Sequence, residues 1–229
     1  MALLLVLLVP FTSLAGCGGS ENAETADIVT TSPWVGIETV TYRLRDANGR
    51  PQGQAVLAVQ RDGDKLRLTQ TFTSDSNRDE TSVLVDPQTL KPASGTRTIT
   101  GDSQDEITTT YTEDGVLIRQ GGKQSGLTVP EHSYDNDTSL FLWRTIRFEE
   151  GYTASYNTII TNRRNRQVVT LRLVGKESLQ VPAGQFSAWR LEIKAGDVKQ
   201  TAWIADTRER TLLKYDNSRN LIFELEKLP

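Results

Sequence analysis

The chain has 229 residues and a formal net charge of −3, and its Lys and Arg are dispersed except for Arg163-Arg164 and Arg166, a tight group that fits a solvated hairpin turn better than a phosphate site. This charge provides no strong positive field, which argues against a nucleic-acid partner. With one cysteine and one histidine, the chain also lacks the ligands for a zinc site built from these residue types, and nothing in it indicates another metal or a cofactor.

Residues 1–16 are predicted to be a secretory signal peptide. They hold an apolar run that is broken at Pro10, well short of the roughly 18 to 20 apolar residues that a membrane span needs. A short apolar segment that ends in small residues is typical of a secretory signal and not of a structural helix. No other segment is apolar enough to enter a bilayer.

The stretch Leu14-Ala15-Gly16-Cys17 resembles the lipobox of bacterial lipoproteins. In that family the cysteine is acylated and becomes the first residue of the mature chain. The resemblance implies that Cys17 is the lipidation site and that membrane lipid holds the protein. It also implies an anchor in the cell membrane or the outer membrane, with the body facing outside the cytoplasm. Since one acyl chain binds only reversibly, stable anchoring needs the two or three chains that this family carries.

Residues 17–31 form a polar stretch rich in Gly, Ser, Thr and Glu, which predicts a flexible tether. Residues 32–229 are then expected to form a single β-rich domain. From Trp34 onward, runs of Thr, Val, Ile and Tyr alternate with Gly and Asp turns. The predicted strands are residues 35–45, 54–60, 65–73, 81–86, 94–100, 106–112, 116–120, 153–161, 167–173, 177–181, 187–194, 199–205, 211–215 and 221–228.

A loop is predicted over residues 121–136, followed by the one helix candidate, residues 140–146. Asp137 has two interpretations, as the residue that caps this helix or as part of a pocket beneath it, and capping is favoured. The strands are long and alternate apolar with polar residues. The sequence therefore predicts an all-β fold, a large curved antiparallel sheet forming a half-barrel or barrel, with one short helix packed against its concave side.

The C-terminal half resembles a bacterial envelope family, domain of unknown function 3108. The resemblance covers about residues 134–228 and depends on the order of several short motifs. They are Asp137-Thr138-Ser139-Leu140-Phe141-Leu142-Trp143-Arg144, Phe148-Glu149-Glu150-Gly151, Val181-Pro182-Ala183-Gly184-Gln185-Phe186 and Ala202-Trp203-Ile204-Ala205-Asp206. It implies a long antiparallel sheet around a helix, similar to the LolA/LolB-like lipoprotein carriers, and it implies no activity.

The sequence offers little chemistry for catalysis, and no catalytic residue is assigned. His132, the one histidine, lies in a loop without a nucleophile elbow. Residues 75–86 imitate a calcium loop but have Glu80 where such a loop requires glycine. Paired carboxylates could act in glycoside hydrolysis, which keeps a glycan hydrolase open as an alternative, but the sequence does not bring any two of them together.

Aromatic residues are the remaining candidates for a binding site. Trp143, Trp189 and Trp203 could line a cavity for a lipid or another apolar ligand, although each also fits as core filler. The leading hypothesis is a membrane-anchored envelope lipoprotein that binds an apolar ligand or an envelope protein partner and is not an enzyme. A non-catalytic scaffold is the first alternative.

Overall fold

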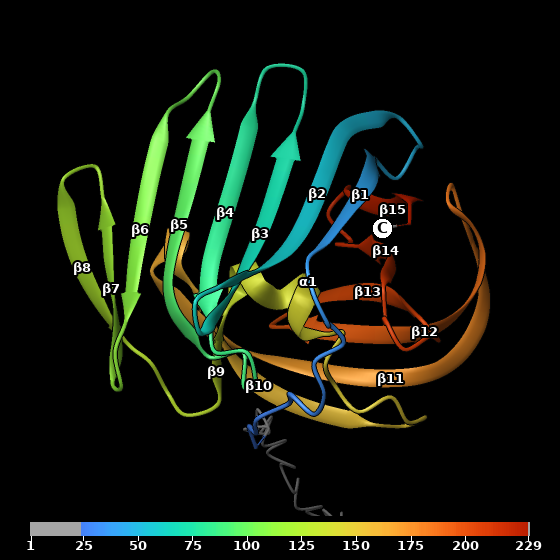
Figure 1. Cartoon of the computed structure of the whole chain (residues 1–229). Helices are drawn as coiled ribbons and strands as arrows, with labels where there is room; N and C mark the ends of the chain where they lie inside the picture. The colour runs from blue at the N-terminus through green and yellow to red at the C-terminus, as the bar shows by residue number, and fades with distance from the viewer. Residues whose placement is uncertain (1–23, 229) are drawn as a thin grey trace, which may run out of the picture.

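A computed structural model describes residues 24–228, and most of them belong to one sheet of 15 strands, in which all neighbours are antiparallel except the parallel pair at one edge, Ser133–Asp135 and Thr153–Ile160 (Figure 1). Eight strands follow one another as a meander in the N-terminal half. They are β1 Glu38–Arg45, β2 Pro51–Asp62, β3 Lys65–Thr73, β4 Arg78–Val85, β5 Pro92–Thr100, β6 Asp105–Tyr111, β7 Gly115–Gln120 and β8 Lys123–Thr128.

The C-terminal half begins with a short crossover and continues as a second meander. The crossover holds strand β9 Ser133–Asp135, a 3-10 turn Asn136–Thr138 and helix α1 Ser139–Leu142. The remaining strands are β10 Thr153–Ile160, β11 Asn165–Val181, β12 Gly184–Ala195, β13 Val198–Ala205, β14 Leu212–Asp216 and β15 Ile222–Lys227, with a second 3-10 turn at Thr161–Arg163.

The order of the strands is that of an up-and-down barrel opened at one seam. Strands β1 and β15, from the two ends of the described chain, pair in the middle of the sheet. Strands β8 and β9, which are consecutive in the chain, form its two edges. The sheet is therefore curved but not closed, in agreement with the predicted half-barrel.

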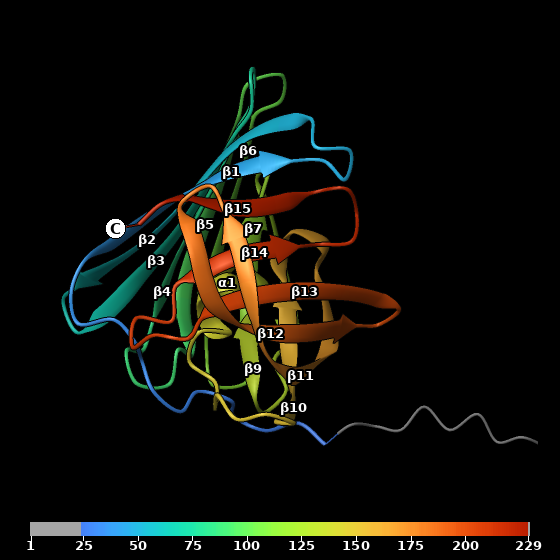
Figure 2. The ribbon, with the colours of Figure 1, turned by 90° about the vertical axis from the view of Figure 1, so that its right-hand side faces the viewer.

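Alternation of buried and exposed side chains explains why these segments form strands with one wet face. In β1, Val40, Tyr42 and Leu44 are buried while the residues between them are more exposed. Turns lie where Gly permits a positive φ, as at Gly63 (φ 62°) between β2 and β3. The inner faces of most strands join in one apolar core around α1, which the curved sheet encloses (Figure 2).

Two segments differ from the predicted strand pattern. The segment predicted as a loop, residues 121–136, contains β8 and β9. Strand β8 has the sequence of a solvated edge strand with no buried side chain, and β9 has only three residues, so neither shows a clear period. Residues 167–181, predicted as two strands, belong to one strand, because β11 absorbs the break as a bulge at Gly175 (φ 153°).

The helix is shorter than the predicted 140–146. Helix α1 ends at Leu142, and the chain continues as tight turns in which Arg144 N–H donates to Phe141 O and Thr145 N–H to Leu142 O. The buried guanidinium of Arg144 holds this segment in place. It donates to both carboxylate oxygens of Glu38, at 2.5 and 2.9 Å, and to the carbonyl oxygens of residues 209 and 210.

The ordered body begins before the predicted domain boundary at residue 32. Ile28 is 1% exposed and belongs to the core. The backbone N–H groups of Ala26 and Thr30 donate to Ser155 O and Thr145 O, both at 2.8 Å. An apolar side chain surrounded by polar residues gives no periodic signal, so residues 24–31 resemble a tether in sequence although they dock on the body. The predicted signal peptide and Cys17 lie outside the described residues.

Side chains bridge the seam where strand pairing stops. Tyr111 of β6 donates its O–H to Asp135 of β9 at 2.5 Å. Arg164 donates to the side chain of Gln120 at 3.0 Å. Ile159 of β10 packs into a small cluster together with Ile107, Val116 and Ile118 of β6 and β7. The two edges of the sheet are thus held by a few side-chain contacts in place of a hydrogen-bonded ladder.

Candidate ligand-binding site

The concave side of the sheet holds an open pocket of about 580 Å³ beside α1. The sheet curves around the short helix α1, which does not fill the concave side and therefore leaves this space. The pocket takes side chains from the segment Asn136–Leu140, from both meanders and from the turns at residues 161–163 and 196–197. It is larger than the pockets beside His132 and beside Trp34, which have volumes of about 340 and 240 Å³.

One wall of the pocket is aromatic. Trp143 packs against Tyr215 with ring centroids 5.5 Å apart, and Tyr215 packs against Phe223 at 5.3 Å. The indole N–H of Trp143 donates to the hydroxyl of Tyr156 at 3.0 Å, and burial raises the pKa of Tyr156 to about 12. Phe72 extends the wall, 5.7 Å from Phe223. These contacts fix the rings, so the wall is a preformed apolar surface.

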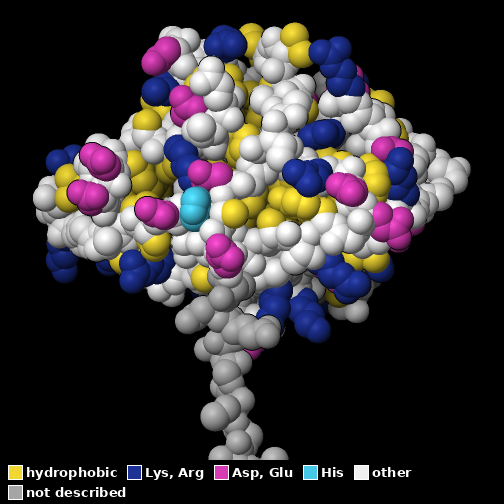
Figure 3. All heavy atoms as spheres, turned by 90° about the horizontal axis from the view of Figure 1, so that it is seen from below, with side chains coloured by type: hydrophobic (Ala, Val, Ile, Leu, Met, Phe, Trp, Pro, Cys, Tyr) yellow, Lys and Arg dark blue, Asp and Glu magenta, His cyan; other side chains and the backbone are white. Residues whose placement is uncertain are grey.

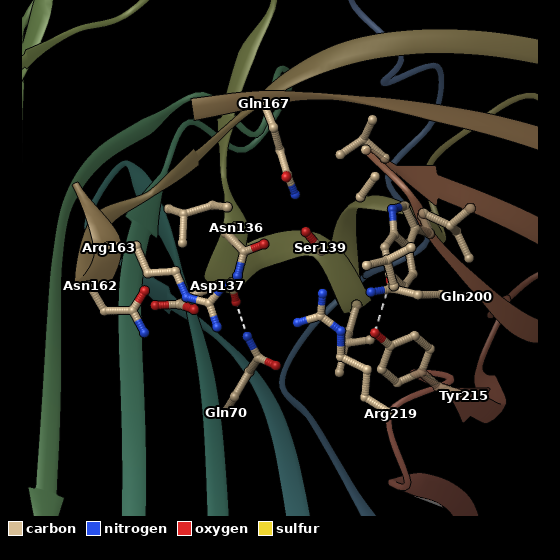
Figure 4. Close-up of a pocket in the computed structure, with 18 of the residues that line it drawn as sticks. Gln70, Asn136, Asp137, Ser139, Asn162, Arg163, Gln167, Gln200, Tyr215 and Arg219 are labelled. Atoms are coloured by element: carbon tan, nitrogen blue, oxygen red, sulfur yellow. Dashed lines mark hydrogen bonds between the residues drawn. The ribbon is translucent and has the colours of Figure 1, made fainter. Parts of the chain in front are cut away.

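The rest of the lining is polar (Figure 4). Gln70 donates its side-chain N–H to the carbonyl oxygen of Asp137. Tyr215 donates its hydroxyl to Gln200 at 3.0 Å. Other polar side chains around the pocket come from separate elements, and they are Arg97, Asn136, Ser139, Asn162, Arg163, Gln167, Asp197 and Arg219. The pocket therefore combines an apolar wall with many hydrogen-bonding groups.

Two neighbouring carboxyl groups lie at the start of the crossover, and Asp137 lines the pocket whereas Asp135 does not. Asp135 is 2% exposed and accepts hydrogen bonds from Tyr111 O–H and from the backbone N–H of Asp137. Burial, followed by the charge of Asp137, raises the pKa of Asp135 to about 7. Burial likewise raises the pKa of Asp137, although Arg97 opposes this shift. Since both oxygens of Asp135 have protein partners, this pair does not present two free carboxylates to a substrate.

Arg97 is neutralised on the polar side of the pocket. Its guanidinium donates to both carboxylate oxygens of Asp79, at 3.0 and 2.5 Å. This bidentate pair joins β4 and β5 and uses two of the donors of Arg97. Arg97 thus contributes to the shape of the site more than to its free charge.

The four predicted binding residues divide into two pairs. Trp143 and Asp137 line the pocket, whereas Trp189 and Trp203 do not. Trp189 packs on Phe148 at 6.1 Å, and its indole N–H donates to Asp206 at 2.9 Å. The indole N–H of Trp203 donates to Glu177 at 2.6 Å. A period-two pattern does not show which face of a strand points to the core, so the sequence could not separate these residues.

The favoured interpretation of Asp137 as the helix cap is wrong. Asp135 precedes the 3-10 turn, and its carboxylate accepts the N–H of Asp137. At α1 itself, Thr138 occupies the cap position without a side-chain hydrogen bond. Asp137 lines the pocket, as the alternative interpretation required.

Sequence reasoning missed the arginines of the site. Arg163 lines the pocket, whereas its neighbour Arg164 bridges the seam. Arg219 enters the pocket from the loop between β14 and β15. The cluster of arginines at residues 163–166 was the available signal, but such clusters usually belong to solvated turns.

The one histidine lies at a second, smaller pocket of about 340 Å³, together with Asp27 and Lys91. Its Nδ1 is 3.3 Å from an Asp27 oxygen, which also accepts hydrogen bonds from Lys91 and from Tyr134 O–H. Figure 3 shows the histidine among charged side chains on the lower face. These contacts attach the N-terminal segment to the body.

Residues 24–228 show no group of three His, Cys, Asp or Glu side chains placed to hold a metal ion. Residues 75–86 resemble a calcium loop in sequence. In the structure, the carboxylate of Asp79 accepts hydrogen bonds from Arg97, and that of Asp86 accepts hydrogen bonds from the backbone N–H groups of Gln88 and Thr89 in a turn. Over the same described range, no helix has the length and apolar character to cross a bilayer.

Comparison with protein families matches residues 39–220 to DUF3108, a family of proteins of unknown function. The match begins at residue 39, well before the segment 134–228 on which the resemblance in sequence depended, and ends at residue 220. No curated protein matches the chain.

One solved structure has a similar fold, and two others match with TM-scores below 0.5. A β-barrel-like protein of the DUF1849 domain from Brucella abortus has a TM-score of 0.54 and 8% identity, with 83% of this chain and 95% of that one covered. A candidate lipoprotein from Parabacteroides distasonis covers 90% of this chain and 100% of its own at 12% identity, with a TM-score of only 0.34. A candidate exported protein with a YmcC-like fold from Bacteroides fragilis has the same TM-score at 10% identity, with 89% of this chain and 100% of that one covered.

Proposed function

Because the chain belongs to the DUF3108 family, whose members are proteins of unknown function, we propose its function from its pocket: it is a cell-envelope binding protein that holds an amphipathic ligand. The supporting observation is the pocket of about 580 Å³ on the concave side, with one aromatic wall and a polar rim. This volume lies within the roughly 300–1,000 Å³ that is typical of small-molecule sites.

The mixed lining refines the expectation of an apolar ligand. A purely apolar molecule would cover exposed polar side chains of the lining, such as Asn162 and Arg163, without offering them hydrogen-bond partners, which costs binding energy. An amphipathic molecule can place its chain on Trp143 and Tyr215 and its polar group at the rim. The lining therefore favours a ligand with both parts.

The energy of chain burial sets the expected affinity. Burying ten methylenes at about 0.8 kcal/mol each contributes roughly 8 kcal/mol. Loss of translational and rotational freedom offsets at least about 4 kcal/mol of this. About 4 kcal/mol then remains, which corresponds to a dissociation constant of about 1 mM, so micromolar binding needs the contacts of the polar rim as well.

The test is titration of a fluorescent fatty-acid analogue against the purified full chain in its Cys17→Ser form, in which no acyl group on residue 17 can compete for the pocket. Saturable binding is expected, and Val198→Trp, which adds bulk at the pocket wall, should weaken it at least tenfold. The matched control is Ala47→Trp, in an exposed turn outside the pocket. Absence of saturable binding, or equal binding by Val198→Trp, would favour the scaffold that docks an envelope protein.

The anchor is the second part of the proposal, supported by Leu14-Ala15-Gly16-Cys17. Cys17→Ser should leave the protein unacylated and move it from the membrane fraction to the soluble fraction, or leave it as an uncleaved precursor. Mass spectrometry of the mature N-terminus checks this. Unchanged fractionation together with an unchanged mass would exclude the lipoprotein assignment.

A further inference from the structure

Arg163 and Arg219 face each other across the rim of the pocket. Arg163 belongs to the turn after β10, and Arg219 to the loop between β14 and β15, so the two come from distant parts of the sheet. Figure 4 shows both side chains directed toward the space between them. Both residues are exposed, which places their charges at the opening, where a ligand enters.

These two guanidinium groups are available for a ligand. Among residues 24–228, neither makes an ion pair with Asp or Glu within 4.0 Å. Arg97, by contrast, is held by Asp79. A free guanidinium carries planar pairs of donors that match the oxygens of a carboxylate or a phosphate.

Two carboxyl groups also line the pocket, and neither removes this preference. Asp137 lies deeper, facing Arg97, and its burial favours the neutral form. Asp197, exposed in the turn between β12 and β13, is one carboxylate against two arginines and makes no ion pair with either within 4.0 Å. At the rim itself the two arginines therefore leave a positive opening above the aromatic wall.

We propose that the pocket selects an anionic amphiphile, whose carboxylate or phosphate group binds Arg163 and Arg219 while its chain packs on the wall of Trp143, Tyr215 and Phe223. This rests on the proposed function, because it assigns the ligand class of the same pocket. The two arginines set the selectivity for charge, and the aromatic wall sets the need for a chain.

The experiment compares four probes on the full chain in its Cys17→Ser form by isothermal titration. The probes are oleate, dodecyl phosphate, oleyl alcohol and inorganic phosphate, the last without a chain. Oleate and dodecyl phosphate should bind at least tenfold more tightly than oleyl alcohol, and inorganic phosphate should bind weakest. The double variant Arg163→Gln/Arg219→Gln should bring oleate to the level of oleyl alcohol. Arg61→Gln, at an exposed site at the end of β2, is the matched control and should change nothing.

Each outcome bears on a different claim. If no amphiphile binds, the proposed function fails. If oleate and oleyl alcohol bind equally, and the double variant changes neither, the pocket takes amphiphiles but the anionic selectivity is wrong. If inorganic phosphate binds as tightly as dodecyl phosphate, the arginines recognise a free anion and not an amphiphile. An unchanged circular dichroism spectrum of the double variant separates lost recognition from lost folding.

Discussion

Strands β11–β13 and strands β5–β8 belong to one sheet, but they bury very different amounts of apolar surface. The inner face of β11–β13 joins α1 and β1–β4 in one continuous core. In β5–β8, here called the outer flap, β5 and β8 have no buried side chain. The flap lies at one side of the sheet (Figure 1). Its buried apolar side chains Ile107, Val116 and Ile118 form a separate small cluster with Ile159 of β10.

This difference teaches that a continuous ladder of hydrogen bonds does not make a sheet uniformly stable. Local stability follows the buried apolar contacts, because exposed backbone hydrogen bonds contribute little net free energy. The flap is expected to open before the core does, with the seam as the site of first separation. Four predictions test or sharpen this contrast.

The largest effect is expected in the core. Trp143→Ala should lower the free energy of unfolding by about 3–5 kcal/mol, because Trp143 is 3% exposed and its removal leaves a cavity beside α1. Trp203→Ala is the matched control. The side chain of Trp203 is only half-buried, so its removal should lower the free energy of unfolding by less than half as much as Trp143→Ala. Denaturant unfolding measures both, and equal losses would mean that α1 is not packed into the core.

The buried acid at the seam should make stability depend on pH. The pKa of Asp135 is about 7 in the folded state and about 4 in the unfolded state. A raised pKa of an acid stabilises the fold below the unfolded pKa, and this contribution is lost as pH rises through the folded value. Between pH 5 and 7 the free energy of unfolding of the wild type should therefore fall by about 2–3 kcal/mol more than that of Asp135→Asn.

Denaturant unfolding of wild type and Asp135→Asn across this pH range checks the prediction. Because the charge of Asp137 raises the pKa of Asp135, the two carboxyl groups titrate together, and the difference between the two proteins reports the titration of this pair. Asp206→Asn is the control of opposite sign. Lys176 lowers the pKa of Asp206, so the contribution of Asp206 to the free energy of unfolding is lost only below about pH 4. Parallel curves for wild type and Asp135→Asn would contradict the assignment.

In the flap, Ile118→Ala should cost about 2–3 kcal/mol, since Ile118 is 1% exposed but belongs to a small cluster. The informative measurement is hydrogen exchange of backbone amides. Exchange should accelerate in β6–β8 and stay unchanged in β11–β13. Equal acceleration in both regions would show that the flap and the core unfold as one unit.

The smallest effect is expected at the seam surface. Arg164→Gln removes the hydrogen bond to Gln120 and should cost less than about 1 kcal/mol, because both side chains are exposed. Hydrogen exchange of the backbone amides in β7 should still be slightly faster in Arg164→Gln than in the wild type. A loss above about 2 kcal/mol would show that the seam depends on this single contact.

Local patterns predicted the architecture well. Alternation in segments such as Val40-Tyr42-Leu44, together with glycine turns, was enough to predict a curved antiparallel sheet with one short helix. The motifs around Trp143 and Trp203 were enough to identify the family, which the match over residues 39–220 confirms. The weak segments were β8, β9 and residues 24–31, where contacts with distant residues replace any local period.

By itself the sequence determined most of the strand pattern and the family, because periodicity and short motifs are properties of neighbouring residues, while the anchor at Cys17 stays a prediction. Only the tertiary structure decided which side chains share the pocket. Trp143 and Asp137 reach it, while Trp189 and Trp203 do not. Arg163 and Arg219 lie 56 positions apart (219 minus 163) and meet only because the sheet curves around α1. That convergence depends on curvature and register across many strands, which no local pattern encodes.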